Sequence, residues 1–260
     1  VREIEPDIFI IENVKSMITA ANGYFMNEIQ REIESLGYFS TCNVLNSKYY
    51  GVPQSRERAF IIAYKHKTLN IPEPDSKSFL TVRDAISDLS YLNSGEGKNK
   101  SFYIHNYQSK YQKELREDSD LLYNHIASKH SEVALKKLAL IPPECGKEFL
   151  PPEMIGNQKF KTTWGRLIWD EPSPTIDTRF DTPSNGKNSH PFLNRAITPR
   201  EAARIQSFPD KFQFFGRKTE ICKQIGNAVP PKLAKKLGES INMQINKTTR
   251  ISNEYYKLFN

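Results

Sequence analysis

The feature that most constrains the fold is a short apolar run near the start of the chain, PDIFIIENV, at residues 6–14. Ile8 to Ile11 are large hydrophobic residues, mostly β-branched, which is typical of a strand buried on both faces in a parallel sheet. Glu12 follows them directly, and a carboxylate there is unfavourable unless it is paired or used. Ligands of open α/β sheets bind outside the carboxyl ends of the strands. The run therefore predicts either a functional Glu12 or a carboxylate that only caps the next loop.

The overall composition indicates a polyanionic partner and no membrane span. The chain has 260 residues, a formal net charge of +7 and a pI of about 9.1, which favours a polyanionic partner, although basic proteins without such a partner are common. Its mean hydropathy is −0.61, and no run of apolar residues is long enough to cross a bilayer. No signal peptide is recognisable, so we expect a cytoplasmic protein.

The three cysteines, Cys42, Cys145 and Cys222, are scattered along the chain. Their odd number and wide spacing favour a reducing compartment and argue against a disulfide framework or a metal site.

Periodicity divides the chain into three parts. A helix over residues 24–36 and strands over 38–45 and 58–64 predict the closing part of a doubly wound α/β sheet. Residues 65–190 have weak periodicity and many Lys, Asn, Ser and Tyr residues, which predicts an irregular inserted lobe with a flexible loop at 94–101. Residues 191–260 return to helical patterns.

Two helices are clearly signalled in this last part. Thr198 is a predicted N-cap, with Pro199 at N1 and Glu201 at N3 completing a capping box. A final helix begins at Pro230-Pro231, and its hydrophobic residues recur every four positions up to Ile245.

Four short motifs occur in a fixed order: ENV at 12–14, QSRER at 54–58, TPREAARIQSFPD at 198–210 and QIGNAVPP at 224–231. Each alone is a weak signal, but together they resemble the C-terminal motifs of the DNA cytosine-5 methyltransferases. The resemblance covers residues 6–64 and about 164–245, and the lobe between them lies where that family has its variable target-recognition region.

The resemblance implies a fold, a reaction and a set of partners. The fold would be the C-terminal part of a doubly wound, class I Rossmann-like methyltransferase sheet, divided into catalytic residues 1–64, a target-recognition lobe at 65–190 and a return to the catalytic domain at 191–260. The activity would be methyl transfer from S-adenosylmethionine to C5 of a cytosine flipped out of double-stranded DNA, in a restriction–modification system.

The resemblance also assigns roles to single residues. Glu12 would be the acid that assists at cytosine N3, while Arg56 and Arg58 would be catalytic arginines, Arg58 near the cytosine O2. Asn227 and Ala228 would lie beside the amino-acid end of the cofactor, with Gly226 permitting close backbone approach. Arg200 and Glu201 would be structural.

Two family parts are absent from this sequence: the glycine-rich cofactor loop and the Pro-Cys-Gln loop that carries the nucleophile. Both would precede Val1, so we expect an N-terminal segment or a separate subunit to supply them, and the chain alone to be inactive. Cys145 follows Pro142-Pro143, but Glu144 intervenes. Cys145 also lies after the QSRER motif, whereas the nucleophile loop of the family would precede Glu12.

Two other functions remain open at this stage. One is a DNA-binding specificity subunit without chemistry of its own; the other is an RNA cytosine-5 methyltransferase acting on tRNA. Glu12, Arg56 and Arg58 favour an enzyme, because DNA binding alone does not need an acid at a sheet edge.

Overall fold

The computed structural model describes residues 1–74, 78–156 and 161–259, with side chains described up to residue 246. Its contacts divide the chain into two compact units. Unit 1 comprises Val1–Asn46, Glu57–Asp75 and Lys232–Asn260, and unit 2 comprises Ser47–Arg56 and Ser76–Pro231. The functional boundaries drawn from the sequence are a different kind of division and stay a prediction.

Unit 1 is built on a three-stranded sheet in the order β1-β3-β2, formed by β1 (Ile8–Val14), β2 (Phe39–Asn46) and β3 (Glu57–Tyr64). The central strand β3 runs antiparallel to both neighbours, so β1 and β2 are parallel to each other. Helix α1 (Tyr24–Ser35) makes the crossover between them, as the sequence predicted.

Two predictions for β1 are wrong: that it pairs in a parallel sheet, and that both of its faces are buried. Within the described residues β1 pairs only with β3, and the pairing is antiparallel. Phe9 and Ile11 pack under α1, but Ile10 points to the other face and stays 44% exposed. Successive strand residues alternate between faces, so an apolar run whose second face is uncovered is only half buried.

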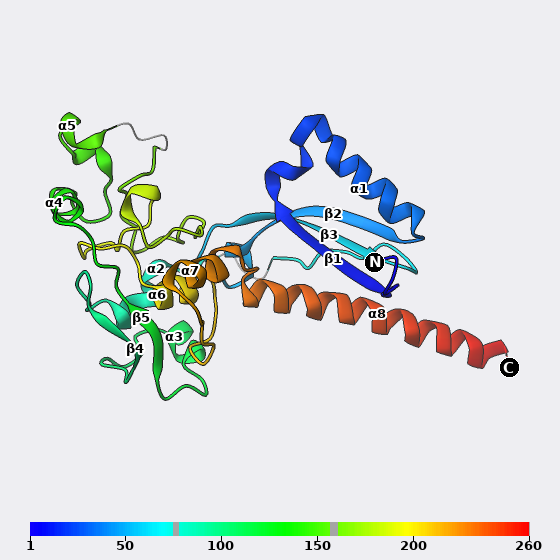
Figure 1. The fold of residues 1–260 in the computed structure, drawn as a ribbon. Coiled ribbons are helices and arrows are strands. Elements are labelled where there is room, and N and C mark those ends of the chain that lie inside the picture. Colours follow the sequence, from blue (N-terminus) through cyan, green and yellow to red (C-terminus); the bar gives the residue numbers. More distant parts are fainter. Residues whose placement is uncertain (75–77, 157–160, 260) are drawn as a thin grey trace. The chain divides into compact units, whose positions relative to one another are not determined.

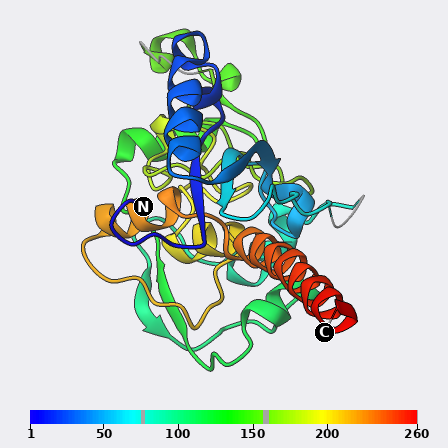
Figure 2. The same ribbon diagram turned by 90° about the vertical axis from the view of Figure 1, so that its right-hand side faces the viewer.

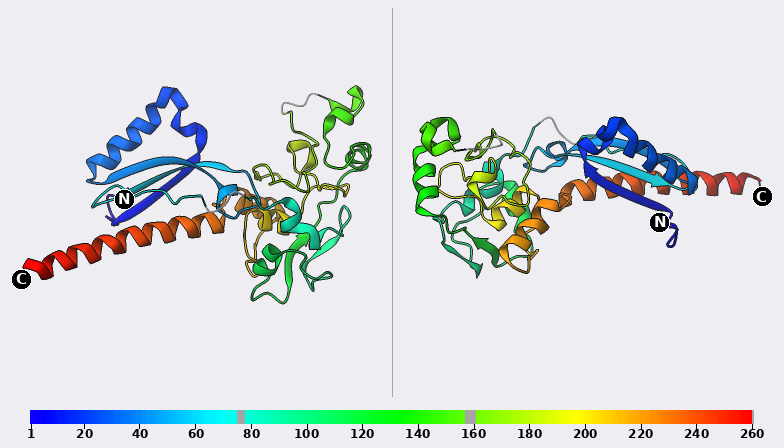
Figure 3. Two further views of the ribbon diagram at one scale, coloured as in Figure 1. Left: turned by 180° about the vertical axis from the view of Figure 1, so that it is seen from behind. Right: turned by 45° about the horizontal axis from the view of Figure 1, so that its top comes forward.

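Helices lie on both sides of this sheet (Figure 3). Ile61 and Ala63 of β3 join the cluster under α1, while Phe60 and Ile62 are buried on the opposite face. Helix α8 (Pro231–Phe259) lies on that second side and extends well beyond the predicted end at Ile245.

Unit 2 consists of short helices, 3-10 turns and a two-stranded ribbon joined by long irregular segments (Figures 1 and 2). Its elements are η3 (Ser47–Tyr50), α2 (Val82–Ile86), η4 (Ser87–Leu89), β4 (Gly97–Ser101), α3 (Lys110–Leu115), β5 (Leu122–Ile126), α4 (Glu132–Leu140), η5 (Lys147–Phe149), α5 (Pro152–Ile155), η6 (Pro183–Asn185), α6 (Pro199–Ile205) and α7 (Lys218–Asn227). The smaller turns η1 (Lys15–Ile18) and η2 (Ala20–Gly23) belong to unit 1.

The predicted flexible loop at 94–101 is wrong, because its second half is strand β4, paired antiparallel with β5. The segment GKNKS has no apolar alternation, so sequence alone gave no strand signal. Gly97 has a φ of +105°, and a Cβ there would lie 2.3 Å from the His125 carbonyl oxygen. Glycine therefore allows the two backbones to approach closely.

Helix α6 is the centre of unit 2, and every residue in it is buried. The predicted capping box is confirmed. Thr198 Oγ1 accepts a hydrogen bond from Glu201 N at 3.1 Å, and the Glu201 carboxylate accepts one from Thr198 N at 2.7 Å. Around α6 pack apolar side chains from α2, α3 and α7, including Ile86, Leu115 and Ile225. Within the described residues, no helix is long and apolar enough to span a membrane.

A glycine in α7 sets the distance between that helix and a neighbouring segment. A Cβ at Gly226 would lie 2.4 Å from the Asp177 carbonyl oxygen, and backbone cannot yield there as a flexible side chain would. We therefore expect Gly226→Ala to lower the free energy of unfolding by about 1–3 kcal/mol, measured by urea denaturation.

Gly238→Ala is the matched control. Gly238 lies in α8 with no heavy atom within 4 Å of its Cβ position, so alanine there should raise stability by up to about 1 kcal/mol. Equal stability of Gly226→Ala and the unaltered chain would contradict the close approach.

Candidate active-site residues

Glu12 and Arg58 are brought together by the β1–β3 register. Val14 lies opposite Arg58, and Glu12 lies opposite Phe60, so Glu12 and Arg58 are diagonal neighbours on one face of the sheet. Arg58 Nε is 3.2 Å from Glu12 Oε1. The side chains are 18% and 24% exposed respectively, which leaves the pair accessible to a ligand.

The contact between them is an ion pair rather than a well-aligned hydrogen bond. Although Arg58 Nε is near, Glu12 Oε1 accepts no hydrogen bond from any described residue. Burial lowers the pKa of Arg58, while the nearby Glu12 carboxylate acts in the opposite direction. Glu12 Oε1 itself is buried, although the side chain is partly exposed, and a buried oxygen with unused hydrogen-bonding capacity is suited to engage a polar group that comes within reach.

Arg56 lies in unit 2, two positions before Arg58, and it is almost completely buried. Its guanidinium donates to the Ile176 carbonyl oxygen at 3.1 Å and to the Gly226 carbonyl oxygen at 2.9 Å. These bonds join the QSRER motif to the QIGNAVPP motif. They give Arg56 a positioning role within unit 2, and its catalytic role stays a prediction.

Gln54 makes a second connection among the motifs. Its Nε2 donates to Gln206 Oε1 at 2.9 Å, and its Oε1 accepts from Ile176 N at 2.8 Å. Gln206 Nε2 in turn donates to the Ile225 carbonyl oxygen at 2.9 Å. The sequence placed both glutamines inside motifs but assigned them no role, because only the fold shows that their amides meet.

Asn227 and Ala228 stand at the end of α7. Asn227 is the last helical residue and is exposed, and Ala228 is the C-cap. An exposed amide can donate to a carboxylate and accept from an ammonium group, so Asn227 is chemically suited to the amino-acid end of S-adenosylmethionine. The close approach expected at Gly226 is made to the protein's own backbone at Asp177.

Two of the three cysteines, Cys42 and Cys222, have a thiol whose pKa is raised rather than lowered. Burial raises the pKa of Cys42, and burial followed by nearby Asp181 raises the pKa of Cys222 to about 12. Cys145 packs against the apolar cluster beneath α4, which contains Leu138 and Trp164. Reactive cysteines need a lowered pKa. The described residues also contain no group of His, Cys, Asp or Glu suited to hold a metal ion.

The TPREAARIQSFPD motif supplies a buried ionic network instead of chemistry. Arg195 binds the Glu201 carboxylate through two nitrogens, at 2.7 and 2.8 Å. Arg204 binds Asp210 at 2.9 and 2.6 Å and Asp88 at 2.6 Å. Burial alone would raise the pKa of Glu201, but the Arg195 guanidinium outweighs it and lowers the pKa to about 2.

Arg200 completes this network through backbone carbonyls. It donates to the carbonyl oxygens of Tyr123 at 2.8 Å, Pro209 at 3.2 Å and Phe212 at 2.6 Å. Burial lowers its pKa to about 10. The side chains of Arg200 and Glu201 are fully buried and bonded to protein groups, which agrees with the structural role that the sequence assigned to them.

Comparison with known proteins identifies the family. The family model for C-5 cytosine-specific DNA methylase matches residues 1–243. A type II methyltransferase of Desulfomicrobium norvegicum, M.DdeI, is 35% identical over 93% of this chain and 64% of its own length. The type II methyltransferase M1.HphI of Haemophilus parahaemolyticus is 33% identical over 93% of this chain and 58% of its own length.

A solved structure agrees on the fold. It is described as a DNA modification methyltransferase encoded within an E. coli prophage, and it matches with a TM-score of 0.72 at 21% identity, covering 94% of this chain and 71% of its own. This likeness confirms the predicted α/β, Rossmann-like methyltransferase fold class. The chain spans about three fifths of the length of the two relatives named above.

Two buried histidines beside the ionic network should make unit 2 sensitive to acid. Burial lowers the pKa of His125 to about 4 and of His190 to about 3. Below about 6.5 the unfolded chain binds protons at these rings while the folded chain does not. The two neutral rings should therefore leave the free energy of unfolding undiminished above that pH, and the free energy of unfolding should fall as the pH drops toward 4.

Thermal midpoints between pH 8 and pH 4 test this, together with NMR titration of the two rings, assigned with His125→Gln and His190→Gln. Both rings should remain neutral at pH 5 in the folded chain. A ring that titrates near pH 6.5 would show that it is in contact with solvent in the folded chain.

Proposed function

Because the chain belongs to the C-5 cytosine-specific DNA methylase family, we propose that it takes part in transferring a methyl group from S-adenosylmethionine to C5 of a cytosine in double-stranded DNA. The observation that carries this proposal is the Glu12–Arg58 pair on one face of β1 and β3. The type II names of the bacterial relatives support a role in a restriction–modification system, and we propose the bacterial cytoplasm as its location.

The pair suits the chemistry of the cytosine ring. C5 is a poor nucleophile until a thiolate adds at C6, and that addition is easier when N3 is protonated or hydrogen-bonded. We assign this task to Glu12, whose Oε1 has unused hydrogen-bonding capacity. Arg58 is assigned to O2, where a fixed guanidinium stabilises the negative charge that develops on the ring. The base must leave the duplex for either contact to form.

The other motif residues are assigned to positioning and to the methyl donor. Arg56 fixes the segment that leads into β3 by bonding to the Ile176 and Gly226 carbonyl oxygens. Asn227 and Ala228 are assigned to the amino-acid end of S-adenosylmethionine, which supplies an electrophilic methyl group when bound. Target recognition is assigned to residues 65–190.

We further propose that the thiolate comes from an N-terminal segment or a separate subunit. Cys42 and Cys222 have raised pKa values, and Cys145 packs in an apolar cluster. The purified chain should therefore transfer no tritiated methyl group from S-adenosylmethionine to mixed-sequence DNA. Turnover by the chain alone would contradict this, and turnover abolished by Cys145→Ser would identify Cys145 as the nucleophile.

The role of Glu12 is tested in the enzyme complemented by a segment carrying the thiolate. Glu12→Gln keeps the shape of the side chain but cannot deliver a proton, so single-turnover methyl transfer should fall by about 10²–10⁴ with DNA affinity little changed. Arg58→Ala removes one donor to the developing charge and should cost about 10²–10³.

Glu34→Gln is the matched control, since Glu34 is an exposed carboxylate on α1. It should transfer methyl groups at the unaltered rate. If Glu12→Gln is folded, by its thermal midpoint, and equally fast, Glu12 is a strand-end cap. That outcome would favour a DNA-binding component without chemistry of its own.

A further inference from the structure

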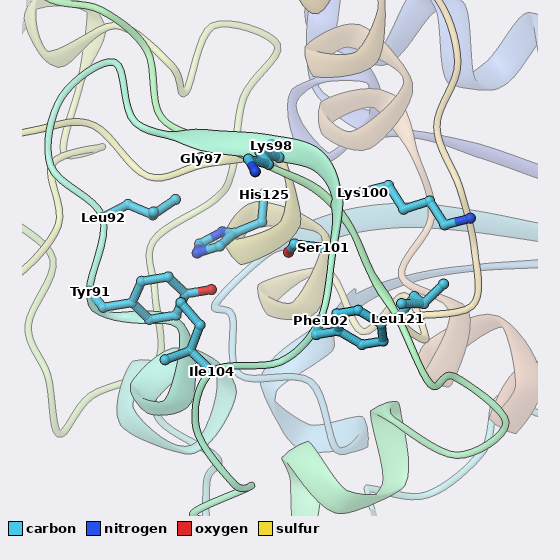
Figure 4. Close-up of a pocket in the computed structure, with 10 residues that line it drawn as sticks. All are labelled: Tyr91, Leu92, Gly97, Lys98, Lys100, Ser101, Phe102, Ile104, Leu121 and His125. Carbon is cyan, nitrogen blue, oxygen red and sulfur yellow. The ribbon is translucent and has the colours of Figure 1, made fainter.

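A hollow in unit 2 lies beside the ribbon of β4 and β5, and none of the roles assigned above uses it. Its volume is about 780 Å³, within the range of roughly 300–1,000 Å³ typical of ligand pockets. Tyr91, Leu92 and Ile104 line one part of it, and the β4 residues with Phe102 line another (Figure 4). Apolar side chains therefore make up most of its wall.

Two lysines of β4 contribute to the lining of this hollow. Lys98 and Lys100 are exposed, line the hollow and form no ion pair with any described residue. Asn99 between them faces the other way, where its Oδ1 accepts a hydrogen bond from Asn124 Nδ2 at 3.1 Å. The ladder to β5 and the close packing at Gly97 fix the strand, so both ammonium groups project from a rigid support.

Next to the lysines the chain exposes large apolar side chains. Phe102 is 78% exposed and Ile104 is 67% exposed, although both border the hollow. Tyr103 between them points inward and donates to Asp210 Oδ2 at 2.8 Å. The inward anchor at Tyr103 fixes the segment, so its apolar neighbours are held outward.

We propose that Phe102 and Ile104 form an apolar wedge that enters a base step of the bound DNA, while Lys98 and Lys100 hold the flanking phosphates. The unstacked base next to the wedge is received by the hollow between Tyr91 and Phe102. This inference rests on the proposed function and adds the surface by which the chain grips its substrate.

The chemistry of the surface fits DNA. Unpaired lysines meet the phosphate backbone, and exposed aromatic and aliphatic side chains are the groups that proteins insert between base steps. An apolar hollow with aromatic walls can stack a nucleobase, as aromatic platforms do in single-strand binding proteins. The net charge of +7 agrees with an anionic partner.

The contribution of the lysines is measured by the salt dependence of DNA binding to the full chain. The probe is a short mixed-sequence duplex, followed by fluorescence anisotropy. Lys98→Ala/Lys100→Ala should reduce the slope of log K against log salt by about 1.8, or about 0.9 for each phosphate contact. Lys136→Ala/Lys161→Ala removes two exposed lysines elsewhere in unit 2 and should leave the slope unchanged.

The wedge is measured with 2-aminopurine, an adenine analogue whose fluorescence rises when it is unstacked. One duplex is first enriched from the mixed-sequence pool by repeated rounds of binding to the chain. A series of versions of this duplex then carries the analogue at successive positions. The unaltered chain should increase the fluorescence at the wedge step. Phe102→Ala should abolish the increase and weaken binding roughly 5- to 150-fold with an unchanged salt slope. Phe149→Ala, at another exposed phenylalanine of unit 2, is the matched control.

The outcomes separate this inference from the proposed function. Unchanged salt slope in the lysine variant, or unchanged fluorescence in Phe102→Ala, overturns the wedge while DNA binding and methyl transfer stand. No DNA binding by the unaltered chain at low salt overturns both. Phe102→Leu should recover part of the fluorescence increase, which a merely unfolded alanine variant would not explain.

Discussion

The defined structure of unit 2 depends on buried guanidinium groups around α6. Arg195, Arg200 and Arg204 are fully buried, and each is bonded to carboxylates or carbonyl oxygens of the protein. Removing one partner of such a pair costs about 3–5 kcal/mol, because a charge is left buried and uncompensated. These buried pairs, together with the apolar cluster around α6, can therefore give a lobe of short helices and loops one defined structure.

Buried side-chain hydrogen bonds also connect the motifs to one another. Gln54 and Arg56 bond to Gln206, Ile176 and Gly226, so the segment before β3 is fixed by groups far away in sequence. Two residues later, Arg58 belongs to the sheet of unit 1 and faces Glu12. The short segment 54–58 thus carries both a structural connection and a catalytic candidate, and its alternating arginines have different tasks.

Much of this was predictable where local chemistry decides structure. The capping box at Thr198 and Glu201, helix α1 and strands β2 and β3 follow from spacing and caps. The half-exposed state of β1 was not predictable, because the covering of a strand is a property of its neighbours. Nor was β4, whose GKNKS segment is a strand only because β5 offers a ladder. The meeting of Glu12 with Arg58 needed the register.

The exposed edge and face of β1 have a consequence for handling the protein. Within the described residues β1 has a strand partner on one side only, and Ile10 and Val14 are exposed along it. An unpaired strand edge beside exposed apolar side chains is a template for pairing with another chain. Pairing along this edge gives the purified chain a route to self-association, and a charged residue at Ile10 would oppose it.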